Sequence, residues 1–217
     1  MKRKNKKSLW IGICVIGAFV LWTLLVRLVD VRMIGPRASR VGFATLNGAI
    51  HDFFGVHMWL YNITDWLGLV PIAAALSFAI LGLVQWIKRK KLCKVDVSIL
   101  ALGVFYIAVI SVYLFFEAVV INYRPILIDG HLEASYPSST TMLTMCVMPT
   151  AAMQLNARIK NSTVRRSVVL GIGVFTASIV IGRLVSGVHW VTDIIGGALF
   201  SLGIVLMYKA FAGFEVK

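Results

Sequence analysis

The sequence predicts an all-α protein, a six-helix transmembrane bundle with an interfacial helix on the outer leaflet between its first and second spans. Of its 217 residues, 59% are hydrophobic and only 14% are charged, and the mean hydropathy is +0.86. These values lie far outside the range of soluble domains. Apolar runs long enough to cross a bilayer recur along the chain, with clusters of lysine and arginine between them. We therefore expect one integral-membrane domain, residues 1–217.

The net charge of +13 does not indicate a nucleic-acid partner. The basic residues form short clusters between the apolar runs, where they orient helices by the positive-inside rule. Cys14, Cys93 and Cys146 lie on separate segments without paired spacing. This spacing indicates neither a disulfide framework nor a metal site, and no cofactor is expected.

The first predicted span covers about residues 9–26. Five basic residues between Met1 and Lys7 precede it, which places the amino terminus in the cytoplasm. No small-x-small cleavage pattern comes before Arg27, so we expect an uncleaved span rather than a signal peptide. Residues 27–65 mix charges with aromatic side chains, which is typical of an amphipathic helix in the outer interface.

Five further spans follow, and basic clusters mark their cytoplasmic ends. The predicted spans cover about residues 66–87, 97–121, 140–155, 167–181 and 191–211. With both termini in the cytoplasm, the positive-inside rule holds at every turn. The sequence therefore predicts a multi-pass plasma-membrane protein whose polar segment 122–139 lies on the non-cytoplasmic face.

Three ionisable residues, Arg183, His189 and Asp193, stand at the mouth of the last predicted span. Charge near hydrocarbon is costly and is usually kept for function. Residues four apart share a helix face, so the Asp193 carboxylate can orient the His189 imidazole while the other ring nitrogen faces a substrate. This spacing is typical of an activated histidine nucleophile.

The predicted topology brings Arg124 and the turn at residues 137–140 to the same face as Arg183 and His189. Guanidinium groups match phosphate oxygens, and a turn that opens a helix offers free N–H groups and the positive end of the helix dipole. With His189 in line with phosphorus, these residues predict a phosphohistidine intermediate that water hydrolyses. The alternative is a buried polar network that ties helices together. No metal is needed, because His131 and Glu133 lack a third ligand.

These residues resemble three motifs of the type 2 phosphatidic acid phosphatase family, which are integral-membrane lipid phosphatases. The family motifs are a lysine, six residues and Arg-Pro; then Pro-Ser-Gly-His; then Ser-Arg, five residues, His, three residues and Asp. Arg124-Pro125 resembles the end of the first, Pro137-Ser138-Ser139-Thr140 the second, and Gly182-Arg183 with His189 and Asp193 the third. The first two motifs alone would be weak, and the third is the specific one.

The resemblance implies that His189 is the nucleophile and Asp193 its orienting partner. It also implies that Arg124, Arg183 and Ser138 bind phosphate. Ser139 belongs to the same phosphate-binding turn, because it stands at the start of the helix that the turn opens.

Three positions depart from the motifs. Glu117 stands where the family has lysine, Gly182 where it has serine, and Thr140 where it has the histidine that protonates the leaving group. A threonine hydroxyl is too weak an acid for that role, and losing a general acid costs about 10²–10⁴ in rate. A lipid diphosphate, such as a polyprenyl diphosphate, expels a phosphate that hardly needs this proton, so we expect it to be preferred. Glu117, His131 and Tyr136 are candidate substitute acids.

Three functions remain open at this point. The first is a lipid phosphatase acting on a membrane lipid phosphate or diphosphate at the outer face of the plasma membrane. The second is a non-catalytic relative that keeps the phosphate pocket and binds a phospholipid or a partner protein. The third is a lipid phosphotransferase, which passes the phosphoryl group to another lipid. The residues identify no particular protein partner.

Overall fold

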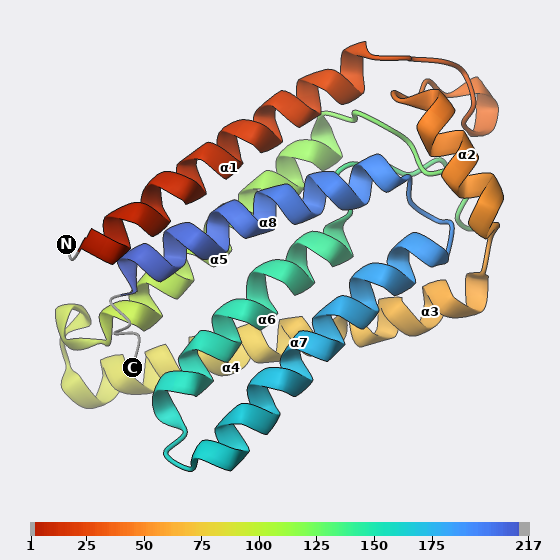
Figure 1. Ribbon diagram of the computed structural model, residues 1–217. Coiled ribbons are helices and arrows are strands. Elements are labelled where there is room, and N and C mark those ends of the chain that lie inside the picture. Colours follow the sequence, from red (N-terminus) through yellow and green to blue (C-terminus); the bar gives the residue numbers. More distant parts are fainter. Residues whose placement is uncertain (1–2, 213–217) are drawn as a thin grey trace.

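The computed structural model describes residues 3–212, and every regular element within that range is helical (Figure 1). The helices are α1 (Arg3–Leu28), α2 (Ala44–Phe54), α3 (Met58–Leu67), α4 (Leu69–Arg89), α5 (Val97–Ala118), α6 (Ser139–Arg158), α7 (Ser162–Val185) and α8 (Val191–Phe211), with short 3-10 helices at Pro36–Ala38 and Leu92–Lys94. The all-α class predicted from the sequence is therefore confirmed.

Five helical stretches within the described residues are long and apolar enough to cross a membrane. They are Asn5–Leu28, Met58–Arg89, Val97–Ala118, Ser162–Val185 and Val191–Phe211. Their positions agree with the predicted spans near residues 9–26, 66–87, 97–121, 167–181 and 191–211, and for α8 the predicted and observed limits coincide.

The remaining predicted span, residues 140–155, forms α6, which is more polar than the other long helices. Its buried side chains include four threonines and Gln154. α6 packs against α4, α5, α7 and α8, so most of its surface meets protein and needs no uniformly apolar face. The count of six spans stays a prediction.

The segment between the first two spans differs from the single interfacial helix that the sequence predicts. It contains two helices, α2 and α3, separated by Gly55 with φ at 69°. Gly68, the one residue between α3 and α4, keeps a helical conformation with φ at −59° and ψ at −18°. Pro71 lacks the N–H that would bond to the carbonyl of Leu67, which explains the local break at that point. The second apolar helical stretch therefore begins at Met58 rather than at residue 66.

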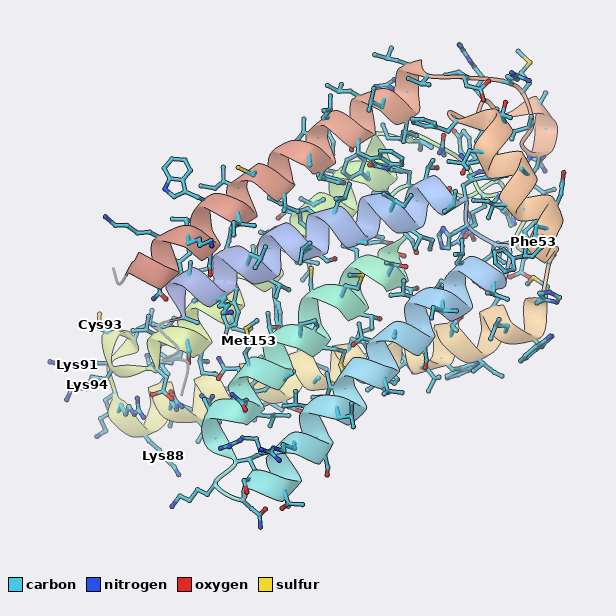
Figure 2. The ribbon with its side chains drawn as sticks, viewed as in Figure 1. Phe53, Lys88, Lys91, Cys93, Lys94 and Met153 are labelled. Atoms are coloured by element: carbon cyan, nitrogen blue, oxygen red, sulfur yellow. The ribbon has the colours of Figure 1, made fainter. Side chains whose placement is uncertain are left out.

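The bundle has two chemically different ends. Figure 1 shows the start of α1, the end of α8 and the α4–α5 connection at one end, and α2 at the other. Figure 2 places the labelled Lys88, Lys91 and Lys94 at the first end and Phe53 at the opposite one. The connections α5–α6 and α7–α8, which carry the predicted site, therefore lie far from the lysine-rich end.

α8 lies against α1 along most of its length. A Cβ atom on Gly203 of α8 would lie 2.7 Å from Cδ1 of Ile16, and one on Gly12 of α1 would lie 3.0 Å from the carbonyl oxygen of Gly203. Small residues at such a crossing let two backbones approach closely inside a membrane. Nearer the site, the ring of Phe19 on α1 packs on Phe200 of α8 at a centroid distance of 5.4 Å.

Replacing Gly203 with leucine should lower the free energy of unfolding by about 1–3 kcal/mol, because the side chain overpacks the crossing between α1 and α8. Thermal unfolding of the full chain in detergent measures this change. Gly17→Leu is the matched control, since a Cβ atom at Gly17 meets nothing within 4 Å. An equal loss in both variants would show that the close crossing contributes nothing particular.

Candidate active site

The turn between α7 and α8 carries His189 and is locked against the corner between α2 and α3. Gly187 has φ at 69°, and a Cβ atom there would lie 2.0 Å from the carbonyl oxygen of Gly55. Only glycine fits this conformation and this contact. The N–H of His57 donates to the carbonyl of Ser186 at 2.9 Å. The α2–α3 corner therefore fixes the backbone of the turn that holds the candidate nucleophile.

Asp193, in the first turn of α8, is fully buried and accepts hydrogen bonds from three donors. Ser135 Oγ donates at 2.6 Å, Asn122 Nδ2 at 3.3 Å and the N–H of Trp190 at 3.0 Å. The Nδ1 atom of His189 lies 3.7 Å from Asp193 Oδ2, which is ion-pair range but longer than a hydrogen bond. The predicted pair is thus adjacent, with its carboxylate fixed by the loop between α5 and α6.

Arg124 faces the other nitrogen of the His189 ring. Its Nη1 atom lies 3.2 Å from Nε2 of His189, and its Nε atom lies 3.0 Å from a carboxylate oxygen of Glu133. Because arginine only donates, Nε2 must accept, which assigns the imidazole proton to Nδ1 on the side of Asp193. Nε2 therefore keeps its lone pair on the side of the arginine.

Burial and positive charge both act on the His189 imidazole, whose residue is only 3% exposed. Burial lowers its pKa, and the positive charges of Arg124 and Arg183 lower it further, so that it lies well below the ordinary 6.5. The ring is therefore neutral near pH 7, which is the form that can act as a nucleophile.

Arg183 is buried in the last turn of α7, where four groups accept from the two ends of its guanidinium. Nη2 donates to Asp65 Oδ1 at 2.8 Å and to Thr140 Oγ1 at 2.5 Å. Nη1 makes longer bonds, each 3.4 Å, to the carbonyl of Tyr61 and to Thr64 Oγ1. The Nε atom is buried and has no partner.

The turn at residues 137–140 lies against the start of α8. The N–H of Ser138 donates to the carbonyl of Asp193 at 3.1 Å, and Ser139 opens α6. The hydroxyl of Ser138 is buried without a partner, whereas that of Thr140 accepts from Arg183. Thr140 therefore acts as an acceptor for the arginine in the place where the resembled motif has a histidine.

Two adjoining cavities border these residues. The smaller is lined in part by His189, Ser135 and Pro137. The larger has a volume of about 510 Å³, and its lining includes Arg124 and Glu133. Both are lined by Tyr113, Glu117, Ala134 and Ser139. Glu117 and Ser139 thus line both the larger cavity and the smaller one that borders the candidate nucleophile.

The structure therefore brings His189, Asp193, Arg124, Arg183, Ser138 and Thr140 into one cluster, with Glu117 and Ser139 on the adjoining cavity wall. Two other candidate acids lie differently. The Tyr136 hydroxyl is 2.7 Å from Thr23 Oγ1, and burial raises its pKa above the ordinary value of 10. His131 is exposed in the loop.

Sequence reasoning missed five residues of this cluster, namely Tyr61, Asp65, Asn122, Glu133 as a partner of an arginine, and Ser135. The ring of Tyr61 lies under both guanidinium groups, with its centroid 4.8 Å from Cζ of Arg183 and 5.9 Å from Cζ of Arg124. None of the five lies on a helix that also carries a motif residue, so no helical periodicity marks them.

Comparisons with known proteins bear on the family and the fold of this chain. The family model described as the PAP2 superfamily matches residues 115–216, a segment that contains all three motifs. Phosphatidylglycerophosphatase B of Bacillus subtilis (strain 168) is 37% identical over 84 residues, which cover 38% of this chain and 40% of that protein. The fold is similar to that of the first transmembrane PAP2 type phosphatidylglycerolphosphate phosphatase from Bacillus subtilis, with a TM-score of 0.62 and 22% identity over 92% of this chain and 93% of that one.

The lowered pKa of His189 has a direct spectroscopic consequence. In NMR spectra of histidine-labelled protein in micelles, the His189 signal should stay in its neutral form as the pH falls through about 6.5, where a free imidazole takes up its proton. His189→Gln assigns the signal by its loss. A titration midpoint at or above about pH 6.5 would mean that burial and the two arginines do not lower the pKa of the His189 imidazole.

Proposed function

We propose that this chain, whose residues 115–216 match the model of the PAP2 superfamily, is a lipid phosphatase of that superfamily. The proposed reaction removes phosphate from a membrane lipid phosphate or diphosphate through a phosphohistidine at His189. Arg124, Arg183, Ser138 and the first turn of α6 would bind the phosphoryl group.

One observation carries the proposal: the buried donors around His189 form an incomplete set that a phosphoryl group would complete. Arg124 Nη1 is directed at Nε2 of His189, the atom that would attack. Nε of Arg183 and Oγ of Ser138 are buried without partners. Buried donors of this kind are costly unless a ligand accepts from them. The positive end of the α6 dipole adds to the same anion site.

The proposed chemistry follows from the placement of the two ring nitrogens. Nε2 attacks phosphorus, and the bond between phosphorus and the leaving oxygen breaks. The phosphoryl group is then held on the imidazole. Asp193 stabilises the positive charge of the substituted ring through Nδ1, which lies 3.7 Å away. The arginines stabilise the equatorial oxygens, with Arg124 moving from Nε2 to a phosphate oxygen. Water then attacks phosphorus and releases phosphate and neutral His189.

The leaving group determines which lipid suits this site. Thr140 accepts from Arg183 and offers no acidic proton, so the alkoxide leaving group of a monoester would depart slowly. A lipid diphosphate, such as a polyprenyl diphosphate, expels a phosphate instead and is the proposed preferred substrate. Glu117 is the remaining candidate acid, because it lines the cavity that borders His189.

We also propose the orientation in the membrane: six spans with α6 as the fourth, α2 and α3 at the outer interface, both termini in the cytoplasm and the site on the outer face. Basic residues gather at the end remote from the site; they are Lys88, Arg89, Lys90, Lys91, Lys94, Arg158, Lys160, Arg165 and Arg166. Exposed Phe53, Trp59 and Trp66 stand at the site end, where aromatic residues suit a headgroup region. We likewise propose that the chain is a single integral-membrane domain of the plasma membrane.

A second candidate is a non-catalytic relative that binds a phospholipid or a partner protein, and the replacement of the leaving-group histidine by Thr140 favours it. A third is a phosphotransferase, in which a lipid hydroxyl takes the place of water. The donor set around His189 serves all three, so activity measurements must separate them.

Purified wild-type protein should release phosphate from a panel of lipid phosphates and diphosphates, fastest from a polyprenyl diphosphate, whereas His189→Ala should lose at least about 10⁴-fold in rate because the nucleophile is gone. A phosphate-release assay measures both. His131→Ala, in the exposed loop, is the control. Equal rates in wild type and His189→Ala across the panel would favour the non-catalytic protein that binds a phospholipid or a partner. With substrates that carry labelled phosphate, label on an acceptor lipid would indicate phosphotransfer. Faster release from phosphatidic acid than from the diphosphate would contradict the proposed preference.

Thr140→His should raise hydrolysis of a phosphate monoester by about tenfold or more and change diphosphate hydrolysis much less, because only the monoester needs the added acid. The ratio of the two kcat/KM values gives the result independently of how much protein is active. An unchanged ratio would show that the acid is supplied elsewhere. In that case a loss of monoester hydrolysis in Glu117→Gln would assign it to Glu117.

A further inference from the structure

α3 reaches the candidate phosphate site although it lies outside residues 115–216, the segment that matches the family model. Its Tyr61, Thr64 and Asp65 all contact Arg183 of α7. The α2–α3 corner is bound to the same region through His57 and Ser186. An element from the first half of the chain therefore determines how the arginine of the third motif is held.

The pair of Arg183 and Asp65 joins a buried charge to an accessible one. The Arg183 side chain is 2% exposed, whereas that of Asp65 is 57% exposed, and Oδ1 of Asp65 lies 2.8 Å from Nη2. A guanidinium buried to this degree needs a counter-charge. Asp65 supplies it from the water-accessible side, so the buried side of the arginine stays available to a ligand.

The contacts divide the guanidinium into a held part and a free part. Asp65 and Thr140 accept from Nη2, and Tyr61 and Thr64 accept from Nη1. The Tyr61 ring, 4.8 Å from Cζ, fixes the plane of the group. Nε alone has no partner, although it is buried.

We infer that Asp65 is a positioning residue, which holds Arg183 by Nη2 and thereby presents its Nε edge to the phosphoryl group. This inference rests on the proposed function, since it specifies how the phosphate site is assembled. Without the Asp65 carboxylate, Arg183 and Arg124 share the Tyr61 ring with no counter-charge on α3, and their mutual repulsion moves Arg183 away from the ligand.

The test compares full-length wild type with Asp65→Asn and Asp65→Glu in detergent. The control is Asp52→Asn, which removes the same charge from an exposed position on α2. Inorganic phosphate is the probe, and its dissociation constant is measured by calorimetry without turnover. In parallel, kcat and KM are measured with the lipid phosphate that wild type cleaves fastest.

Asp65→Asn should weaken phosphate binding about tenfold and lower kcat/KM about ten- to a hundredfold, because the charge-assisted bond that holds Arg183 in position is lost. Asp65→Glu keeps the charge but displaces the carboxylate, so its dissociation constant should lie between those of wild type and Asp65→Asn. Asp52→Asn should match wild type. If Asp65 had a merely structural role, Asp65→Asn would lower the melting temperature and the active fraction without changing the dissociation constant of the folded protein for phosphate.

Two results would overturn the inference. Phosphate binding by Asp65→Asn that equals that of Asp52→Asn would show that Arg183 needs no help from α3. Tighter binding would show that Asp65 competes with phosphate for the arginine. If Asp65→Asn does not fold, Asp65→Glu alone tests the inference. A dissociation constant for phosphate equal to that of wild type would then count against it.

The same measurements separate this inference from the proposed function. A wild-type protein that binds phosphate, weakly in Asp65→Asn, yet releases no more phosphate from lipids than His189→Ala would remove the phosphatase and keep the positioning role. A wild-type protein that binds no phosphate at millimolar concentration would overturn both.

Discussion

The structure depends on the burial of two guanidinium groups at one end of an apolar bundle. Arg183 and Arg124 are both shielded from solvent, and each is paired with one carboxylate, Asp65 at 2.8 Å and Glu133 at 3.0 Å. A buried charge without a partner costs several kcal/mol. Arg124 finds its carboxylate within the loop between α5 and α6, whereas Arg183 on α7 depends on α3 for its own, so α3 must be in place before Arg183 can be buried with a partner.

Burial and the same two charges together determine the protonation state of His189. They keep the His189 imidazole neutral, which preserves the lone pair on Nε2, and a phosphoryl anion arriving there would meet the same positive field. Asp193 acts from the other side of the ring, where Ser135 and Asn122 fix its carboxylate. Attraction for the anion and availability of the nucleophile thus arise from one arrangement of charge.

Much of this site could be predicted from the sequence, because its central residues obey simple geometric rules. The alternation of spans and basic clusters locates His189 and Asp193 at one end of the bundle, although His189 meets Asp193 from the turn before α8 and not along one helix face. The partners Asp65 and Ser135 could not be predicted, since they lie about 118 and 58 residues from the atoms they bind and only the folded packing brings them there. The second span was expected to begin at about residue 66 and not at Met58 because the aromatic and polar residues of α3 look interfacial, although Gly68 continues the helix.

α6 is the most polar of the long helices and is enclosed by four others. Thr150 donates to carbonyls of its own helix and also meets the hydroxyl of Tyr106 on α5, whereas Gln154 donates to the carbonyl of Ser98, a partner that exists only after assembly. Translocation machinery tests each segment against lipid for its own hydrophobicity, and one as polar as this inserts poorly alone. In the proposed six-span arrangement, insertion of α6 would therefore depend on the apolar helices that enclose it, which would make membrane integration of this half of the chain a cooperative event.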